Sequence, residues 1–170
     1  LARASAMLAS RGRLVKPTLL RRQENPLTGE AQETRVDALS EAPALAIGQR
    51  DIEGVIRSMT AVMHGRRGTA RASGRRSAYR MAGKTGTAQV VSIAQDSEYD
   101  AKSLRETLRD HALFIAFAPV DHPKIAIAVV VENGGSGAAA AAPIARKVMD
   151  YFFLKRLRRA ALTGVSGVFG

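Results

Sequence analysis

The sequence contains no cysteine and no tryptophan, and aromatic residues make up only 5% of the chain. The absence of cysteine excludes a disulfide framework, a thiolate nucleophile and thiolate-ligated zinc, and it leaves the redox compartment open. With so few aromatic rings, a hydrophobic core has to be built mainly from alanine, valine, isoleucine and leucine. The length of 170 residues is enough for one domain with such a core.

Long apolar runs are also missing. The longest runs, such as Ile125 to Val131, have the size of a strand, whereas about 20 apolar residues are needed to span a bilayer. The first residues do not follow the basic, apolar and small order of a signal peptide. Because Leu1 lies inside a helical pattern, we interpret the start as a cut within a longer polypeptide. Any anchor or targeting signal is then expected upstream.

Acidic residues are outnumbered by basic ones, and the formal net charge is +11. The basic residues gather in two stretches, which are Arg66, Arg67, Arg71, Arg75, Arg76 and Arg80 in the middle and Lys155, Arg156, Arg158 and Arg159 near the end. Such clusters indicate an anionic partner, which can be nucleic acid, an anionic membrane surface or a phosphate-bearing substrate. The alternative is a solvated basic surface without a partner, which is the more common meaning of a charge run.

Apolar residues at helical spacing predict three helices, over Leu1–Ser10, Asp51–His64 and Ala138–Leu154. The middle one is clearly amphipathic and is expected to begin at Asp51 and to end before a glycine. Residues 21–46 are polar and rich in turn-forming residues, so we expect a long connection with little regular structure.

Three extended segments follow the middle helix. Residues 79–93 show a tendency to alternate, and residues 113–118 and 125–131 are apolar enough to be buried strands. The connection between the last two, residues 119–123, is so short that it requires an antiparallel hairpin. Strands that follow one another between helices predict an α+β domain, with an antiparallel three-stranded sheet flanked by helices.

The most informative segment is Gly83-Lys84-Thr85-Gly86-Thr87. Its first three residues match the end of a phosphate-binding P-loop, which also needs a glycine five residues earlier and a helix straight afterwards. The earlier position is Ala78, and the residues after Lys84 and Thr85 are strand-like. Both differences exclude a P-loop.

A lysine followed by threonine and glycine on a strand has another use. Thr85 and Thr87 lie two residues apart, so on an extended chain their hydroxyl groups point the same way. Gly86 removes a side chain, which lets a ligand approach the backbone. The same combination of a lysine, hydroxyl groups and a glycine on one strand occurs in penicillin-recognising enzymes that are acylated on serine. On its own the tripeptide is weak evidence, and an ordinary edge strand is the more common meaning of such a short motif.

The surrounding sequence resembles the class B penicillin-binding proteins, and most of all those of cell-wall elongation. The resemblance rests on Met81–Val90, on Arg109-Asp110-His111 leading into Phe114–Pro119, and on Val130–Gly135. It covers about residues 1 to 154 and is densest from Tyr79 to Asn133. It implies part of a serine β-lactamase/transpeptidase-like fold, in which the strand with Lys84 forms one wall of the active-site cleft.

In that family the reaction is D,D-transpeptidation, in which a serine attacks a peptidoglycan stem peptide and an amine from a second stem resolves the acyl-enzyme. The resemblance implies that Lys84 is catalytic and that Thr85, Gly86 and Thr87 bind the carboxylate of the stem peptide or of a β-lactam. The backbone N–H of Thr87 is expected to supply half of an oxyanion hole, whose donors stabilise the charge that develops on the acyl oxygen.

The sequence departs from the family in one respect. None of its serines is followed three residues later by lysine, and no Ser-x-Asn occurs; the nearest matches have arginine, as at Ser73 and Arg76. Arginine stays protonated and cannot act as a base. The family carries both motifs before the lysine strand, so we expect this chain to be inactive alone. One alternative is a truncated, inactive product, and a less favoured one is a basic nucleic-acid-binding module, which would show salt-dependent affinity.

The resemblance also sets expectations for the rest of the molecule. Residues 1–154 are expected to be the C-terminal portion of the transpeptidase domain and residues 155–170 a basic, flexible tail. No cofactor and no metal is implied, and the three histidines, His64, His111 and His122, do not have the spacing of metal ligands. The expected partners are stem peptides, β-lactams and membrane proteins of the elongation complex, at the periplasmic face of the inner membrane, and no nucleic acid is expected.

Overall fold

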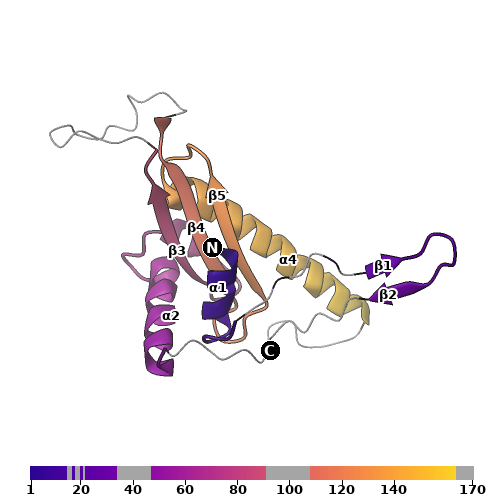
Figure 1. Ribbon diagram of the computed structural model, residues 1–170. Coiled ribbons are helices and arrows are strands. Elements are labelled where there is room, and N and C mark those ends of the chain that lie inside the picture. The colour runs from indigo at the N-terminus through magenta and orange to yellow at the C-terminus, as the bar shows by residue number, and fades with distance from the viewer. Residues whose placement is uncertain (15–16, 18–19, 21, 34–46, 91–107, 164–170) are drawn as a thin grey trace.

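The computed structural model describes residues 1–14, 17, 20, 22–33, 47–90 and 108–163. At residue 33 and from residue 156 onwards it describes only the backbone. Figure 1 shows a central sheet with helices on both sides. The elements are, in chain order, helix α1 (Ala2–Ala9), strands β1 (Arg22–Glu24) and β2 (Ala31–Glu33), helices α2 (Gln49–His64) and α3 (Arg71–Gly74), strands β3 (Ala82–Ala88), β4 (His111–Ala118) and β5 (Ile125–Val131), the π-helical turn η2 (Gly137–Ala141) and helix α4 (Ala142–Thr163).

The central sheet has the order β3-β4-β5, and both neighbouring pairs are antiparallel. Lys84 of β3 lies opposite Ile115 of β4, which in turn lies opposite Ala128 of β5. The predicted α+β class, the hairpin of the last two strands and the bounds of β5 are therefore confirmed. The middle strand is buried on both faces, which explains why its sequence is apolar almost throughout.

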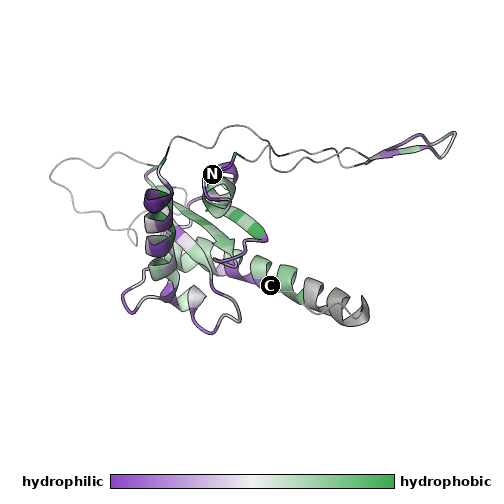
Figure 2. Ribbon diagram, turned by 90° about the horizontal axis from the view of Figure 1, so that it is seen from below, coloured by the Kyte–Doolittle hydropathy of each residue, from purple (hydrophilic) through white to green (hydrophobic). Residues whose placement is uncertain are grey.

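Each face of the sheet has its own hydrophobic cluster. On one face, Phe114 of β4 packs in a cluster with Met149 and Phe153 of α4. On the other face, Phe117 packs with Ile56 of α2 and with residues of α1. Because neighbouring residues of a strand point to opposite faces, β4 connects the two clusters. Helices α1 and α2 thus cover one face and α4 covers the other (Figures 1 and 2).

Helix α2 positions β3 and was predicted from its periodicity. It begins at Gln49, two residues before the predicted start, and ends at His64 as predicted. Its buried residues include Ile52, Ile56 and Met63, which lie on one side of a helix of 3.6 residues per turn. The strongly amphipathic pattern therefore corresponds to a helix that packs on the sheet.

Two predictions about regular structure were wrong. Residues 22–33 form an antiparallel hairpin of β1 and β2, with Arg22 opposite Glu33, where we expected little regular structure; residues 34–46 lie outside the described part of the chain. In addition, α4 continues to Thr163, well beyond the predicted end at Leu154. Its last turns consist largely of leucine, alanine, arginine and lysine, which are strong helix formers, so charge alone was a poor signal for a helix end.

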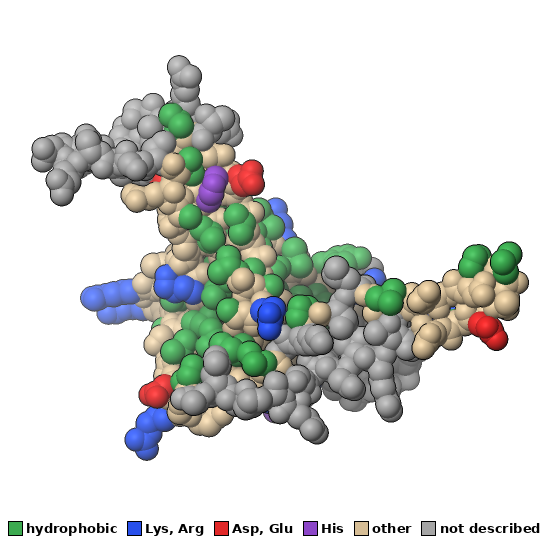
Figure 3. All heavy atoms as spheres, viewed as in Figure 1, with side chains coloured by type: hydrophobic (Ala, Val, Ile, Leu, Met, Phe, Trp, Pro, Cys, Tyr) green, Lys and Arg blue, Asp and Glu red, His purple; other side chains and the backbone are tan. Residues whose placement is uncertain are grey.

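Among the described strands, β3 and β5 form the two edges of the central sheet. On β5, Val130 leaves 54% of its surface exposed. Hydrophobic side chains are visible around α1 and over the strands in Figure 3. None of the helices in the described part of the chain is long and apolar enough to cross a membrane.

Candidate functional site on the edge strand β3

The Lys84–Thr87 segment is extended, as the sequence predicted. It lies within β3, whose only partner among the described strands is β4. Lys84 is exposed, whereas Ala82 and Gly83 at the start of the strand are buried. The strand therefore leaves the core at Lys84, and its second half lies along the edge of the sheet, where backbone and side chains are available to a ligand.

The two glycines of the motif have different surroundings. A Cβ atom at Gly83 would lie 2.6 Å from Cζ of Phe114 and 3.0 Å from Sδ of Met63, so the packing of α2 against the sheet requires a glycine there. At Gly86 the nearest atom to such a Cβ is Cβ of Leu113 at 3.4 Å, an acceptable contact. Packing therefore explains Gly83, while Gly86 leaves open the close approach of a ligand.

The strand register separates the side chains of the motif by face. Thr85 lies opposite Phe114 and Thr87 lies opposite Ala112, which share the face of the sheet that α4 covers. Both threonines therefore point the same way, as predicted from their spacing. Lys84 lies on the other face, so the motif presents its cation and its hydroxyl groups on opposite sides of one exposed edge.

The backbone N–H and carbonyl groups of alternate residues in β3 point outward, away from β4. The Lys84 ammonium donates a hydrogen bond to the carbonyl oxygen of Thr85 at 2.6 Å, so this carbonyl is accessible at the outer edge. In an antiparallel pair, alternate residues turn both backbone groups to the same side. The N–H of Thr87 is therefore turned outward together with the backbone groups of Thr85, away from β4.

A histidine fixes the start of the strand. The backbone N–H of Met81 donates a hydrogen bond to Nε2 of His64 at 3.1 Å, which requires this nitrogen to be unprotonated. Burial is the main cause that lowers the pKa of His64, and the positive charge of Arg80 lowers it further. The neutral imidazole thus links the end of α2 to the residue that precedes β3, which is a structural role.

A second group of residues holds the segment before β3 against α4. The hydroxyl group of Tyr79 donates a hydrogen bond to Asp150 at 2.8 Å, and Nε of Arg146 binds the same carboxylate at 2.7 Å. The guanidinium of Arg146 also lies 5.7 Å from the centre of the Tyr79 ring. Burial and then the hydrogen bond to Asp150 raise the pKa of Tyr79, so this hydroxyl group stays protonated.

Two contacts near the strand could not be read from the sequence. Oγ1 of Thr69, in the loop after α2, lies 3.4 Å from Oγ1 of Thr85, and no pattern links these residues. Tyr79 and Asp150 lie 71 residues apart along the chain, and no pattern links them either. Only the spacing of Arg146 and Asp150, four apart on a predicted helix, was a readable signal.

Cavities in the described part of the chain lie elsewhere. One of about 500 Å³ is lined by α1 and the loop between β4 and β5, and includes Arg13, His122 and Lys124. Another, of about 390 Å³, lies beside α2 and includes His64 and Arg80. Neither of these cavities includes a residue of β3, whose second half is an exposed edge of the described sheet.

Comparison with known proteins identifies the class of this domain. Residues 1–150 match the penicillin binding protein transpeptidase domain family. Because the match covers most of the chain, the chain belongs to this family, and its α+β fold matches that of solved members of the family.

Within the family, the similar curated proteins share one description. The chain is 36% identical over 156 residues to the peptidoglycan D,D-transpeptidase MrdA of Haemophilus influenzae, a match that covers 92% of this chain and 23% of that protein. It is 55% identical over 78 residues to MrdA of Acinetobacter baumannii, over 46% of this chain and 12% of that protein. The chain therefore spans about a quarter or less of these relatives.

Solved structures show the same similarity. PBP2 of Pseudomonas aeruginosa, in complex with WCK 5153, matches 88% of this chain and 28% of its own chain, with 37% identity and a TM-score of 0.65. Penicillin-binding protein A of Mycobacterium tuberculosis, as its penicillin G acyl-enzyme complex, matches 88% of this chain and 30% of its own, with 27% identity and a TM-score of 0.59. The chain is thus similar to PBP2-type transpeptidase domains.

Proposed function

We propose that this chain is the C-terminal portion of a peptidoglycan D,D-transpeptidase, and that β3 forms one wall of its acyl-transfer site. The observation that carries the proposal is the exposed edge from Lys84 to Thr87, which offers a cation, two hydroxyl groups and outward backbone groups. The family match and the shared description of the similar curated proteins support the reaction class.

In the proposed reaction, a serine Oγ attacks the penultimate D-Ala carbonyl of a stem peptide and loses its proton to a base. The tetrahedral oxyanion collapses to an ester, the base passes the serine proton to the amide nitrogen, and the terminal D-Ala leaves as an amine. An amine of a second stem then attacks the ester, forms the new amide and returns the proton to the serine. The outward N–H of Thr87 would donate to the oxyanion in both steps.

The other residues of the motif would hold the substrate. The hydroxyl groups of Thr85 and Thr87 would donate to the terminal carboxylate, and Gly86 would allow the peptide to approach the strand. Lys84, on the other face, would direct its ammonium toward the reacting serine. Since no Ser-x-x-Lys occurs among residues 1–170, that serine would come from a preceding segment of the enzyme.

The test uses a fluorescent penicillin, which acylates the serine of the complete enzyme. We expect Lys84→Ala and Thr85→Val to slow acylation strongly, since the first removes the ammonium that would face the reacting serine and the second removes a hydroxyl group that would hold the carboxylate. Thr28→Val, an exposed threonine in the β1–β2 hairpin, is the matched control and should acylate at the normal rate. The 170-residue chain alone should form no covalent adduct, and a stable ester on it would contradict the proposal.

The partners follow from the same assignment. PBP2 of Helicobacter pylori has been solved in complex with MreC, and by analogy we propose that the enzyme containing this chain binds a membrane protein of the elongation complex at the periplasmic face. β-Lactams and peptidoglycan stem peptides are the proposed ligands. We also propose that the transpeptidase domain ends near residue 154, and that residues 155–170 are a basic, glycine-containing tail.

A further inference from the structure

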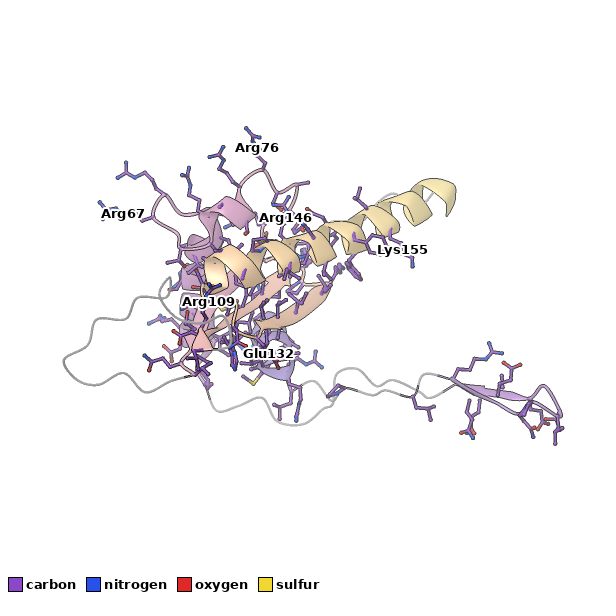
Figure 4. The ribbon with its side chains drawn as sticks, turned by 90° about the horizontal axis from the view of Figure 1, so that it is seen from above. Arg67, Arg76, Arg109, Glu132, Arg146 and Lys155 are labelled. Carbon is purple, nitrogen blue, oxygen red and sulfur yellow. The ribbon has the colours of Figure 1, made fainter. Side chains whose placement is uncertain are left out.

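The loop between α2 and β3 carries a cluster of arginines that the proposed reaction does not use. We call residues 65–76 the arginine loop. Its exposed arginines are Arg66, Arg67, Arg71, Arg75 and Arg76. Figure 4 shows Arg67 and Arg76 projecting outward on the same side of the molecule. The loop therefore concentrates positive charge on one surface.

This charge has no acidic counterpart nearby in the sequence. No aspartate or glutamate occurs between Glu53 and Asp96. The ion pairs formed by the described residues join Arg11 to Glu53, Arg22 to Glu24 and Arg146 to Asp150, and they include none of the loop arginines. Such a surface attracts anions and raises their local concentration.

Packing against α2 and α4 holds the backbone of the arginine loop in a fixed shape, so its arginines project from defined positions. A Cβ atom at Gly68 would lie 2.3 Å from the carbonyl oxygen of Val62, and one at Gly74 would lie 2.1 Å from that of Met63. Both glycines therefore pack directly on the last turn of α2. On the other side, Nη1 of Arg146 donates to the carbonyl oxygen of Ser73 at 2.8 Å, which ties the loop to α4.

The arginine loop also borders the candidate site. Thr69 lies between Arg67 and Arg71, and its Oγ1 is 3.4 Å from Oγ1 of Thr85. A peptide whose terminal carboxylate lies at Thr85 and Thr87 would therefore have this basic loop beside it. Arginine is suited to such a role, because its planar guanidinium binds carboxylates with two parallel hydrogen bonds.

We propose that the arginine loop binds additional carboxylates of the peptide substrate, so that the site selects acidic peptides over neutral ones. This inference rests on the proposed function, because it takes the terminal carboxylate to lie on β3. Arg67 and Arg71, which flank Thr69 in the sequence, are the residues assigned to this contact. An exposed arginine–carboxylate pair contributes modestly, and two such pairs correspond to about a fivefold gain in affinity.

Binding of labelled peptides to the 170-residue chain tests the inference by fluorescence anisotropy at fixed ionic strength. The probes end in D-Ala-D-Ala and differ only in two internal residues, which are both glutamate or both glutamine. We expect the acidic probe to bind about fivefold more tightly. Arg67→Gln/Arg71→Gln should abolish that gain, whereas Arg50→Gln/Lys147→Gln, which removes the same charge from exposed positions on α2 and α4, should retain it.

Equal affinities for the two probes would overturn the inference, as would an equal loss of the gain in both double variants. An oligonucleotide that binds more tightly than the acidic probe, and depends on Arg67 and Arg71, would assign the loop to nucleic acid instead. A probe whose C-terminal carboxylate is replaced by an amide distinguishes the carboxylate role proposed for β3 from the role proposed for the arginine loop. If amidation has no effect while the glutamate gain persists, the carboxylate role of β3 fails and the peptide-binding role of the arginine loop stands.

Discussion

Replacing Thr87 by proline in the complete enzyme would test the proposed oxyanion donor without removing a ladder hydrogen bond. Proline lacks a backbone N–H and is tolerated on an edge strand where that group faces outward. The carbonyl of Thr85 accepts a hydrogen bond from the exposed Lys84 side chain, so the backbone groups of Thr85 are turned away from β4. Thr87 lies two residues further along the strand, so its N–H is turned away from β4 as well. We therefore expect the variant to fold.

The magnitude follows from the chemistry of the lost donor. Removing one of two oxyanion donors typically costs about 3 kcal/mol of transition-state stabilisation, which corresponds to a rate lower by about two to three orders of magnitude. The cost in folding stability should stay below about 1 kcal/mol, because no hydrogen bond to β4 is lost. We therefore expect Thr87→Pro to have a large effect on the rate of acylation and a small effect on folding stability.

The assay is the rate of acylation by a fluorescent penicillin, measured together with urea unfolding. Thr87→Val is the control, since it keeps the N–H and removes only the hydroxyl group, and it should lose less rate than Thr87→Pro. Acylation of Thr87→Pro at nearly the normal rate would refute the oxyanion role. A variant that fails to fold would refute the outward orientation of the Thr87 amide.

Three further predictions concern stability and association. Gly83→Ala should lower the free energy of unfolding by about 1–3 kcal/mol in thermal or urea melts, because its Cβ would overlap Phe114, while Gly86→Ala should have a much smaller effect. Since the folded state lowers the pKa of His64 below its usual 6.5, the unfolded chain takes up the proton first, and urea melts should show stability falling as pH drops below that value. The exposed β5 edge predicts that the chain self-associates by edge-to-edge pairing, and Val130→Lys should reduce this association in sedimentation experiments, because charge on an edge strand blocks such pairing.

Each of these predictions has a contrary outcome. Equal melting curves for the two glycine variants would show that Gly83 is not required by packing. If His64→Gln leaves the slope of stability against pH unchanged, His64 is not the titrating group. If Val130→Lys associates as strongly as the parent chain, the β5 edge is not the surface through which the chain associates.

The sequence predicted the central sheet well because its strands have strong local signals. Ile125–Val131 is apolar at every position and follows a short connection, so both its structure and its pairing were readable. The sequence contains no equally strong signal for the β1–β2 hairpin. Its residues Arg22–Glu24 are polar and exposed, and the turn residues between the strands indicated a loop as readily as a hairpin.

The sequence predicted the candidate residues within β3 but not the tertiary contacts around them. Lys84 and Thr87 could be placed on an extended segment because the glycine and the strand-like residues after Thr85 do not fit the helix that follows a P-loop. The approach of Thr69 to Thr85 depends on how the loop after α2 folds back, which is a tertiary effect without a local pattern. The same holds for the interaction of Tyr79 with Asp150.

The most direct test of the central claim is an NMR titration of the chain with a peptide that ends in D-Ala-D-Ala. If β3 is the carboxylate-binding wall, the backbone amide signals of Thr85 and Thr87 should shift most, since both amides are turned outward at the strand edge. The signal of Ile115, which lies on the central strand β4, should shift less. Shifts confined to the cavity beside α1, with none from Lys84 to Thr87, would contradict the account.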